Sequence, residues 1–75
     1  MKSTQFGKWK IEVSSEKALF VQEEKRLILL NSDKYYMFLA ELDKEDNITI
    51  QNIDSDIELN ILYSSKTIKI AFKED

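Results

Sequence analysis

The sequence predicts an all-β chain, an antiparallel meander of about seven short strands that forms a small barrel or a two-layer sandwich. Three observations predict it. Apolar and polar residues alternate over most of the chain, branched and aromatic residues are abundant, and the breaks between apolar segments are short and polar. Such breaks join antiparallel neighbours, because a parallel crossover needs about a dozen or more residues. We expect residues 1–75 to form a single small domain.

Four segments alternate between apolar and polar residues over most of their length. Trp9, Ile11 and Val13 are separated by Lys10 and Glu12, which predicts a strand with one buried face. Branched and flat side chains pack well on such a pleated surface. The same pattern predicts three further strands, at residues 48–51, 57–63 and 67–73.

The middle of the chain has a different pattern. Residues 18–21, 27–30 and 35–42 are apolar at both alternating positions, which predicts strands with two apolar faces. One face lines the core. The second must be covered by the rest of a closed barrel, by a second copy of the chain or by a partner. We therefore expect this chain to associate with itself, as a homodimer, or with another protein.

Residues 35–42 also fit a helix. Ser32 is a suitable N-cap residue, and Tyr35, Phe38, Leu39 and Leu42 would then form one apolar stripe. The alternative fold class is therefore α+β, with one helix at about 33–43. We favour the strand.

The turns are unusual for an all-β chain, because it has no proline and its only glycine is Gly7. Tight two-residue hairpin turns commonly need glycine at positive φ. We therefore expect longer loops, or loops that use Asn and Asp. In the predicted loop 43–47, Asn47 is the residue expected to adopt the left-handed conformation.

The composition argues against catalysis and metal binding. Cysteine and histidine are absent, which excludes disulfides and thiolate sites and removes the commonest general base. Asp54, Asp56 and Glu58 alternate like the start of a calcium loop, but the glycine and distal glutamate of such a loop are missing. We expect no enzymatic activity, no catalytic residues, no metal and no cofactor.

The charge balance limits the partners. The chain has 14 acidic and 11 basic residues and a net charge of −3, which argues against nucleic acid as a ligand. No apolar run approaches the ~18 residues of a membrane span, and the first residues do not resemble a signal peptide. We expect a cytoplasmic location and no membrane contact. The acidic loops 43–47 and 54–56 would attract a basic partner.

These observations favour a non-enzymatic protein-binding module, a small acidic inhibitor or regulator that blocks a partner protein sterically. The alternatives are a single-stranded nucleic-acid-binding β-barrel, in which aromatic side chains stack on bases, and a structural subunit of a larger assembly. The aromatic residues either fill the core or anchor a partner. The candidate partner-binding residues are Trp9, Tyr35, Tyr36, Phe38, Asp43, Glu45, Asp46, Asp54 and Asp56.

Overall fold

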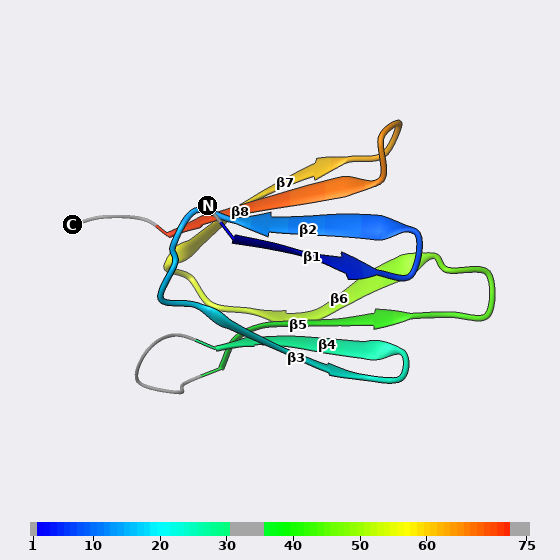
Figure 1. Ribbon diagram of the computed structural model, residues 1–75, viewed down its shortest axis with the longest axis horizontal. Helices are drawn as coiled ribbons and strands as arrows, with labels where there is room; N and C mark the ends of the chain where they lie inside the picture. Colours follow the sequence, from blue (N-terminus) through cyan, green and yellow to red (C-terminus); the bar gives the residue numbers. More distant parts are fainter. Residues whose placement is uncertain (1, 31–35, 73–75) are drawn as a thin grey trace.

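The computed structural model describes residues 2–30 and 36–72, which form eight β-strands and no helix (Figure 1). The fold is therefore all-β, as predicted. The strands are β1 (Lys2–Phe6), β2 (Trp9–Val13), β3 (Leu19–Glu23), β4 (Arg26–Leu30), β5 (Tyr36–Leu42), β6 (Ile48–Ile53), β7 (Ile57–Leu62) and β8 (Thr67–Phe72).

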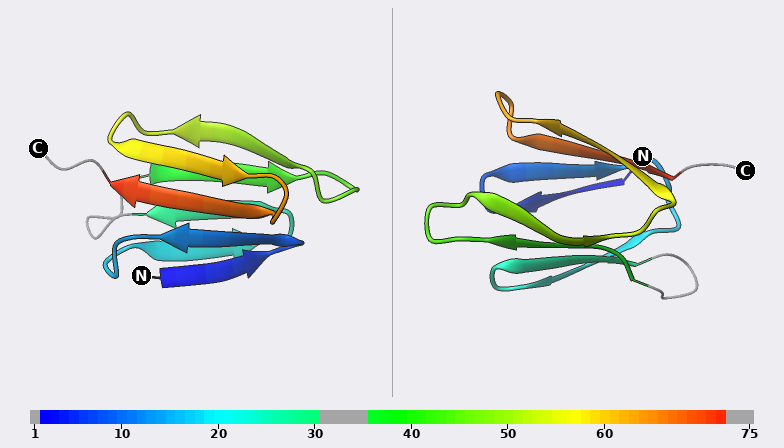
Figure 2. Two further views of the ribbon diagram at one scale, coloured as in Figure 1. Left: turned by 90° about the horizontal axis from the view of Figure 1, so that it is seen from above. Right: turned by 180° about the vertical axis from the view of Figure 1, so that it is seen from behind.

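The strands form two four-stranded sheets that stack face to face (Figures 1 and 2). The first sheet has the strand order β1-β2-β8-β7, and the second has the order β3-β4-β5-β6. Of the two predicted shapes, the two-layer sandwich is confirmed, whereas the barrel is not closed. All strand pairs are antiparallel except β2 and β8, which run parallel.

Two short connections do not join neighbouring strands. Residues 14–18 lead from β2 in the first sheet to β3 in the second, and residues 54–56 return from β6 to β7. The prediction that short loops join antiparallel neighbours is wrong at these two points. Facing sheets lie only about 10 Å apart, so a few residues can span the gap. Because the chain returns to the first sheet through residues 54–56, β8 lies between β2 and β7 and runs parallel to β2.

Seven of the strands correspond to predicted segments, and β1 was missed. Its sequence, KSTQF, has no apolar residue before Phe6 and so lacks the pattern that indicates a strand. The helical alternative is wrong over residues 36–42, which form β5. Its remaining part, including Ser32 and Tyr35, lies outside the described residues.

Within residues 2–30 and 36–72, four turn residues have positive φ: Gly7 (61°), Glu24 (51°), Asp46 (61°) and Lys66 (51°). Asp46, not Asn47, adopts the left-handed conformation in the β5–β6 loop. The β3–β4 turn has only two residues, because Glu23 pairs with Arg26, so the expectation of longer loops is wrong there. Side chains other than Gly, Asn and Asp adopt this conformation at a cost of about 1–2 kcal/mol.

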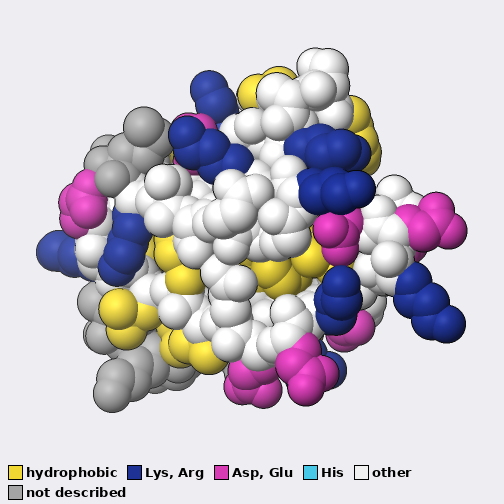
Figure 3. Space-filling view, turned by 45° about the vertical axis from the view of Figure 1, so that its right-hand side comes forward, with side chains coloured by type: hydrophobic (Ala, Val, Ile, Leu, Met, Phe, Trp, Pro, Cys, Tyr) yellow, Lys and Arg dark blue, Asp and Glu magenta, His cyan; other side chains and the backbone are white. Residues whose placement is uncertain are grey.

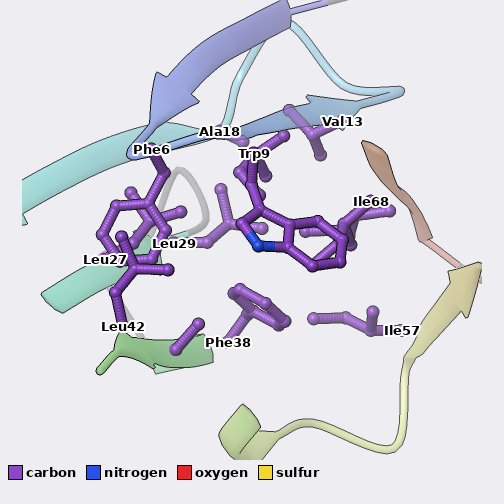
Figure 4. Close-up of a cluster of buried hydrophobic side chains, with 13 residues drawn as sticks. Phe6, Trp9, Val13, Ala18, Leu27, Leu29, Phe38, Leu42, Ile57 and Ile68 are labelled. Atoms are coloured by element: carbon purple, nitrogen blue, oxygen red, sulfur yellow. The ribbon is translucent and has the colours of Figure 1, made fainter. Parts of the chain in front are cut away.

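The core lies between the sheets and is apolar (Figure 4). Among the described residues, no polar or charged side chain is fully buried. Side chains from both sheets meet at the centre, where Trp9 and Ile68 of the first sheet face Phe38 of the second. The fully buried apolar residues are Phe6, Trp9, Ile11, Val13, Ala18, Leu27, Leu29, Phe38, Ala40, Leu42, Ile57, Ile68 and Ile70.

The indole of Trp9 contacts two turns, the β5–β6 loop and the β7–β8 turn. It is 3% exposed, and its Nε1 donates a hydrogen bond of 3.0 Å to the backbone carbonyl of Asp46 in the second sheet's β5–β6 loop. On its outer side, the Tyr63 ring packs edge-on at 6.0 Å, and Lys66 Nζ lies 5.5 Å from the indole. Gly7 lies nearby, and a Cβ at Gly7 would come within 2.5 Å of Leu42 Cδ1.

We predict that Glu24→Gly stabilises the protein. Glycine removes the strain of a φ of 51° at this exposed turn position, and this gain exceeds glycine's entropic cost. The free energy of unfolding should rise by about 0.5–1 kcal/mol in urea titrations. Lys44→Gly, at an exposed turn position without positive φ, is the control and should bring no gain. Equal effects of the two changes would contradict the prediction.

We also predict that Trp9→Phe lowers the free energy of unfolding by about 1–3 kcal/mol, because it removes both buried volume and the bond to Asp46. Tyr63→Phe is the matched control. It retains the ring that packs on Trp9, and Tyr63 is 71% exposed, so its stability should stay near wild type. Chemical denaturation followed by circular dichroism measures both. A Trp9→Phe variant as stable as Tyr63→Phe would refute the role given to the indole.

Candidate interaction surface

The outer face of the second sheet is apolar. Inward residues such as Leu27 and Leu29 of β4 are fully buried, so the residues that alternate with them point away from the core. The cross-strand register aligns these outward positions on β3, β4 and β5. The resulting outer apolar face consists of Leu19, Val21, Ile28, Leu30 and Leu39.

This outer apolar face is open to solvent. Leu19 is 45% and Val21 37% exposed, and the other three members are half-buried. No described strand lies over it in Figures 1 and 2. In Figure 3, hydrophobic side chains reach the surface in the lower left part of the molecule, on the side of the second sheet. The expected second apolar face of the middle strands is therefore present and lies on the outside of the sandwich.

Charged residues border the outer apolar face at one end. Glu23, Arg26 and Glu41 lie side by side on β3, β4 and β5. Arg26 Nη2 lies 3.7 Å from Glu41 Oε1, and both side chains are well exposed. An apolar centre with a polar rim is the usual composition of a protein-binding surface.

The outer face of the first sheet differs, because its outward positions are mostly polar. It contains a hollow of about 730 Å³ above Ala71, walled by Glu12, Glu58, Asn60 and Lys69. Glu12 pairs with Lys10 at 3.5 Å, so charges of both signs are interspersed there. Among the described residues, no group of three or more acidic side chains could hold a metal ion. This face has the character of an ordinary solvated surface.

The predicted acidic residues lie at the two ends of β6. Asp43, Glu45 and Asp46 occupy the β5–β6 loop, and Asp54 and Asp56 occupy the connection to β7. Two of these carboxylates stabilise their own turns. Asp43 Oδ1 accepts hydrogen bonds from the backbone N–H groups of Glu45 (2.8 Å) and Asn47 (2.9 Å), and Asp54 Oδ1 accepts one from Asp56 (3.1 Å). Lys25 Nζ lies 3.3 Å from Asp46 Oδ1.

The structure describes the side chains of two of the four predicted aromatic anchors. Trp9 and Phe38 are buried in the core, so neither is available on the surface as a partner anchor. Tyr36 belongs to β5, but its side chain lies outside the described residues, as does the whole of Tyr35. The five residues of the outer apolar face were not among the predicted partner-binding residues. The apolar pattern at both alternating positions of the middle strands could have identified them.

Comparison with known proteins gives no relative: no family model, curated protein or solved structure matches the chain. The described residues include no helix that could cross a membrane.

We predict that Asp43 makes stability depend on pH in acid. Hydrogen bonds from the backbone of Asn47, and then from that of Glu45, lower the pKa of Asp43 below its ordinary value of 3.8. A lowered pKa in the folded state stabilises the protein above the ordinary value, and this stabilisation is lost as the pH falls through the folded-state pKa. Asp43→Asn should therefore flatten the fall in melting temperature between about pH 5 and about pH 2.

The control is Glu45→Gln, which changes the net charge of the same loop by the same amount. The melting temperatures of wild type, Asp43→Asn and Glu45→Gln are measured across this pH range and compared. If the two variants flatten the curve equally, the effect comes from net charge, and the role assigned to the Asp43 turn is wrong.

Proposed function

We propose that the chain is a non-enzymatic protein-binding module, a small acidic inhibitor or regulator that blocks a partner protein sterically. The outer apolar face of the second sheet is its contact surface. The observation that carries this proposal is the exposure of Leu19 and Val21 beside Ile28, Leu30 and Leu39 on three neighbouring strands.

The energetic argument starts from the solvent exposure of this face. Burial of apolar surface stabilises a complex by about 25 cal/mol per Å². Three strands about 4.8 Å apart and five residues long give a face of about 14 Å by 17 Å, or about 240 Å². This rectangle already includes the charged row of Glu23, Arg26 and Glu41. A standard interface buries about 800 Å² on each partner, so the partner must also contact surface around it.

The acidic loops support a partner with basic patches. Their carboxylates lie at both ends of β6, at the edge of the same sheet. Charges at the rim of an interface mainly accelerate association and select partners of opposite sign. In this proposal the apolar face supplies affinity, and the loops 43–47 and 54–56 orient the approach.

The two alternatives have less support. Base stacking needs exposed aromatic side chains, whereas Trp9 is 3% exposed. Tyr63 and Lys66 are exposed beside it, but two side chains are few for a nucleic-acid surface. A structural subunit would use more than one large apolar surface, and the outward positions of the first sheet are mostly polar.

The test uses Ile28→Lys, which places a charge at the centre of the outer apolar face. Leu62→Lys is the matched control, because Leu62 is also half-buried but points outward on the first sheet. Immobilised wild type and Leu62→Lys should capture the same protein from a lysate, and Ile28→Lys should bind the purified protein at least about tenfold more weakly in calorimetry. Equal capture by all three folded proteins would contradict the proposal.

A further inference from the structure

The edge strand β3 differs from the other edges of the sandwich. The four edge strands are β1 and β7 of the first sheet and β3 and β6 of the second. Proteins commonly protect such edges with charged or polar side chains, because the unpaired backbone groups can pair with another strand. The outward side chains are Ser3 and Gln5 on β1, Thr49 and Asn52 on β6, and Glu58 and Asn60 on β7 with Leu62 at its end. On β3 they are Leu19 and Val21, with Glu23 only at its end.

The register of the β3–β4 hairpin identifies the free backbone groups. Because a two-residue turn joins Glu23 to Arg26, these residues exchange both hydrogen bonds, and the bonding alternates along the strand from there. The backbone groups of Leu19 and Val21 therefore point toward β4. Those of Phe20 and Gln22 point away from the sheet.

Few other contacts occupy this edge. The carbonyl of Ala18, just before β3, also points away from the sheet, and it accepts a hydrogen bond of 2.7 Å from Lys2 Nζ. The Gln22 side chain turns toward β1, where its Nε2 donates to Thr4 Oγ1 and to the carbonyl of Gln5, both at 2.9 Å. The N–H and C=O groups of Phe20 and Gln22 have no backbone partner among the described residues.

We propose that β3 pairs antiparallel with β3 of a second copy of this chain, about a twofold axis at Val21. Phe20 and Gln22 lie symmetrically on either side of Val21, so the twofold axis places Phe20 of each copy opposite Gln22 of the other. Each free N–H then donates to a free C=O across the axis. The two copies of Val21 face each other as a closely spaced, non-hydrogen-bonded pair.

A second copy fits this edge because the strand is complementary to itself. The axis places Glu23 beside Leu19 of the second copy and keeps the two copies of Glu23 about 13 Å apart, at ~3.3 Å per residue. The loops 43–47 and 54–56 adjoin β6, at the opposite edge of the sheet. Asp46 of the first loop reaches Lys25 of the β3–β4 turn, whose positive charge offsets it. The other acidic side chains lie toward β6, so the loops oppose dimerisation little.

Dimerisation also enlarges the outer apolar face. A larger face is an advantage only if it binds a partner protein, so this point rests on the function proposed above. The two sheets join into one, and their apolar faces become continuous across the axis. The area of this face, with its charged row included, grows from about 240 Å² to about 480 Å², closer to what one side of a stable interface needs.

The test compares Gln22→Pro with Gln22→Ala by sedimentation equilibrium. Both changes remove the side-chain bonds to Thr4 and Gln5, but only proline removes the outward N–H. Wild type and Gln22→Ala should form dimers of similar affinity. Gln22→Pro should dimerise at least about 100-fold more weakly, with a melting temperature close to that of Gln22→Ala.

A second variant covers the case in which Gln22→Pro does not fold. Val21→Lys places two like charges on the axis and should also give a folded monomer. Ser3→Lys on the β1 edge is its control and should remain dimeric. The inference is overturned by a wild type that stays monomeric up to about 1 mM, or by Val21→Lys chains that associate as tightly as wild type.

No partner protein enters these measurements. A monomeric wild type that still loses its partner on Ile28→Lys would therefore end the dimer inference and leave the proposed function standing.

Discussion

The hydrogen bond from Trp9 Nε1 to the carbonyl of Asp46 is the interaction on which the rest of the structure depends. A buried indole N–H needs an acceptor, and Asp46, on the loop of the other sheet, supplies it at 3.0 Å. This bond joins a central strand of the first sheet to the β5–β6 loop of the second. The same loop lies close to the β1–β2 turn, where a Cβ at Gly7 would come within 3.3 Å of Asp46 Cγ and 2.5 Å of Cδ1 of Leu42 at the end of β5. Gly7 also has a φ of 61° in its own turn, and the backbone N–H of Asp46 donates to the carbonyl of Asp43 within its loop.

The two outer faces then acquire opposite characters from the same rule of alternation. Inward residues of both sheets meet around Trp9. The polarity of each outer face is therefore set by the residues that alternate with the inward ones along each strand. In the first sheet these are mostly polar, as Lys10 and Glu12 are on β2. In the second they are mostly apolar on β3 and β4. A small sandwich needs only one apolar face on each sheet to fold. The additional apolar residues of the second sheet are the basis for the contact proposed above.

Local patterns predicted the strands, but not how distant segments combine. The alternation around Ile11 identified β2, while β1 was missed because KSTQF has little apolar content and is held by pairing with β2. The parallel pairing of β2 with β8 depends on the whole second sheet between them. Glu24 and Lys66 adopt positive φ because the hairpins require it, against their own preference. For the candidate site, alternation could not tell whether Trp9 and Phe38 point to the core or to solvent.

The positions of charge and apolar surface fit together only when the second sheet is considered whole. Its order places the apolar edge β3 on one side and β6, flanked by the acidic loops, on the other. In a dimer formed through β3, the two β6 strands are separated by seven strand spacings, about 34 Å at 4.8 Å each. Charges that far apart are screened from each other at physiological salt, where the Debye length is about 8 Å. The acidic loops can therefore attract basic patches of a partner from both flanks, while the apolar centre supplies the contact. In this proposal, a partner needs an apolar centre about three strands wider than one chain's face, with basic residues on either side.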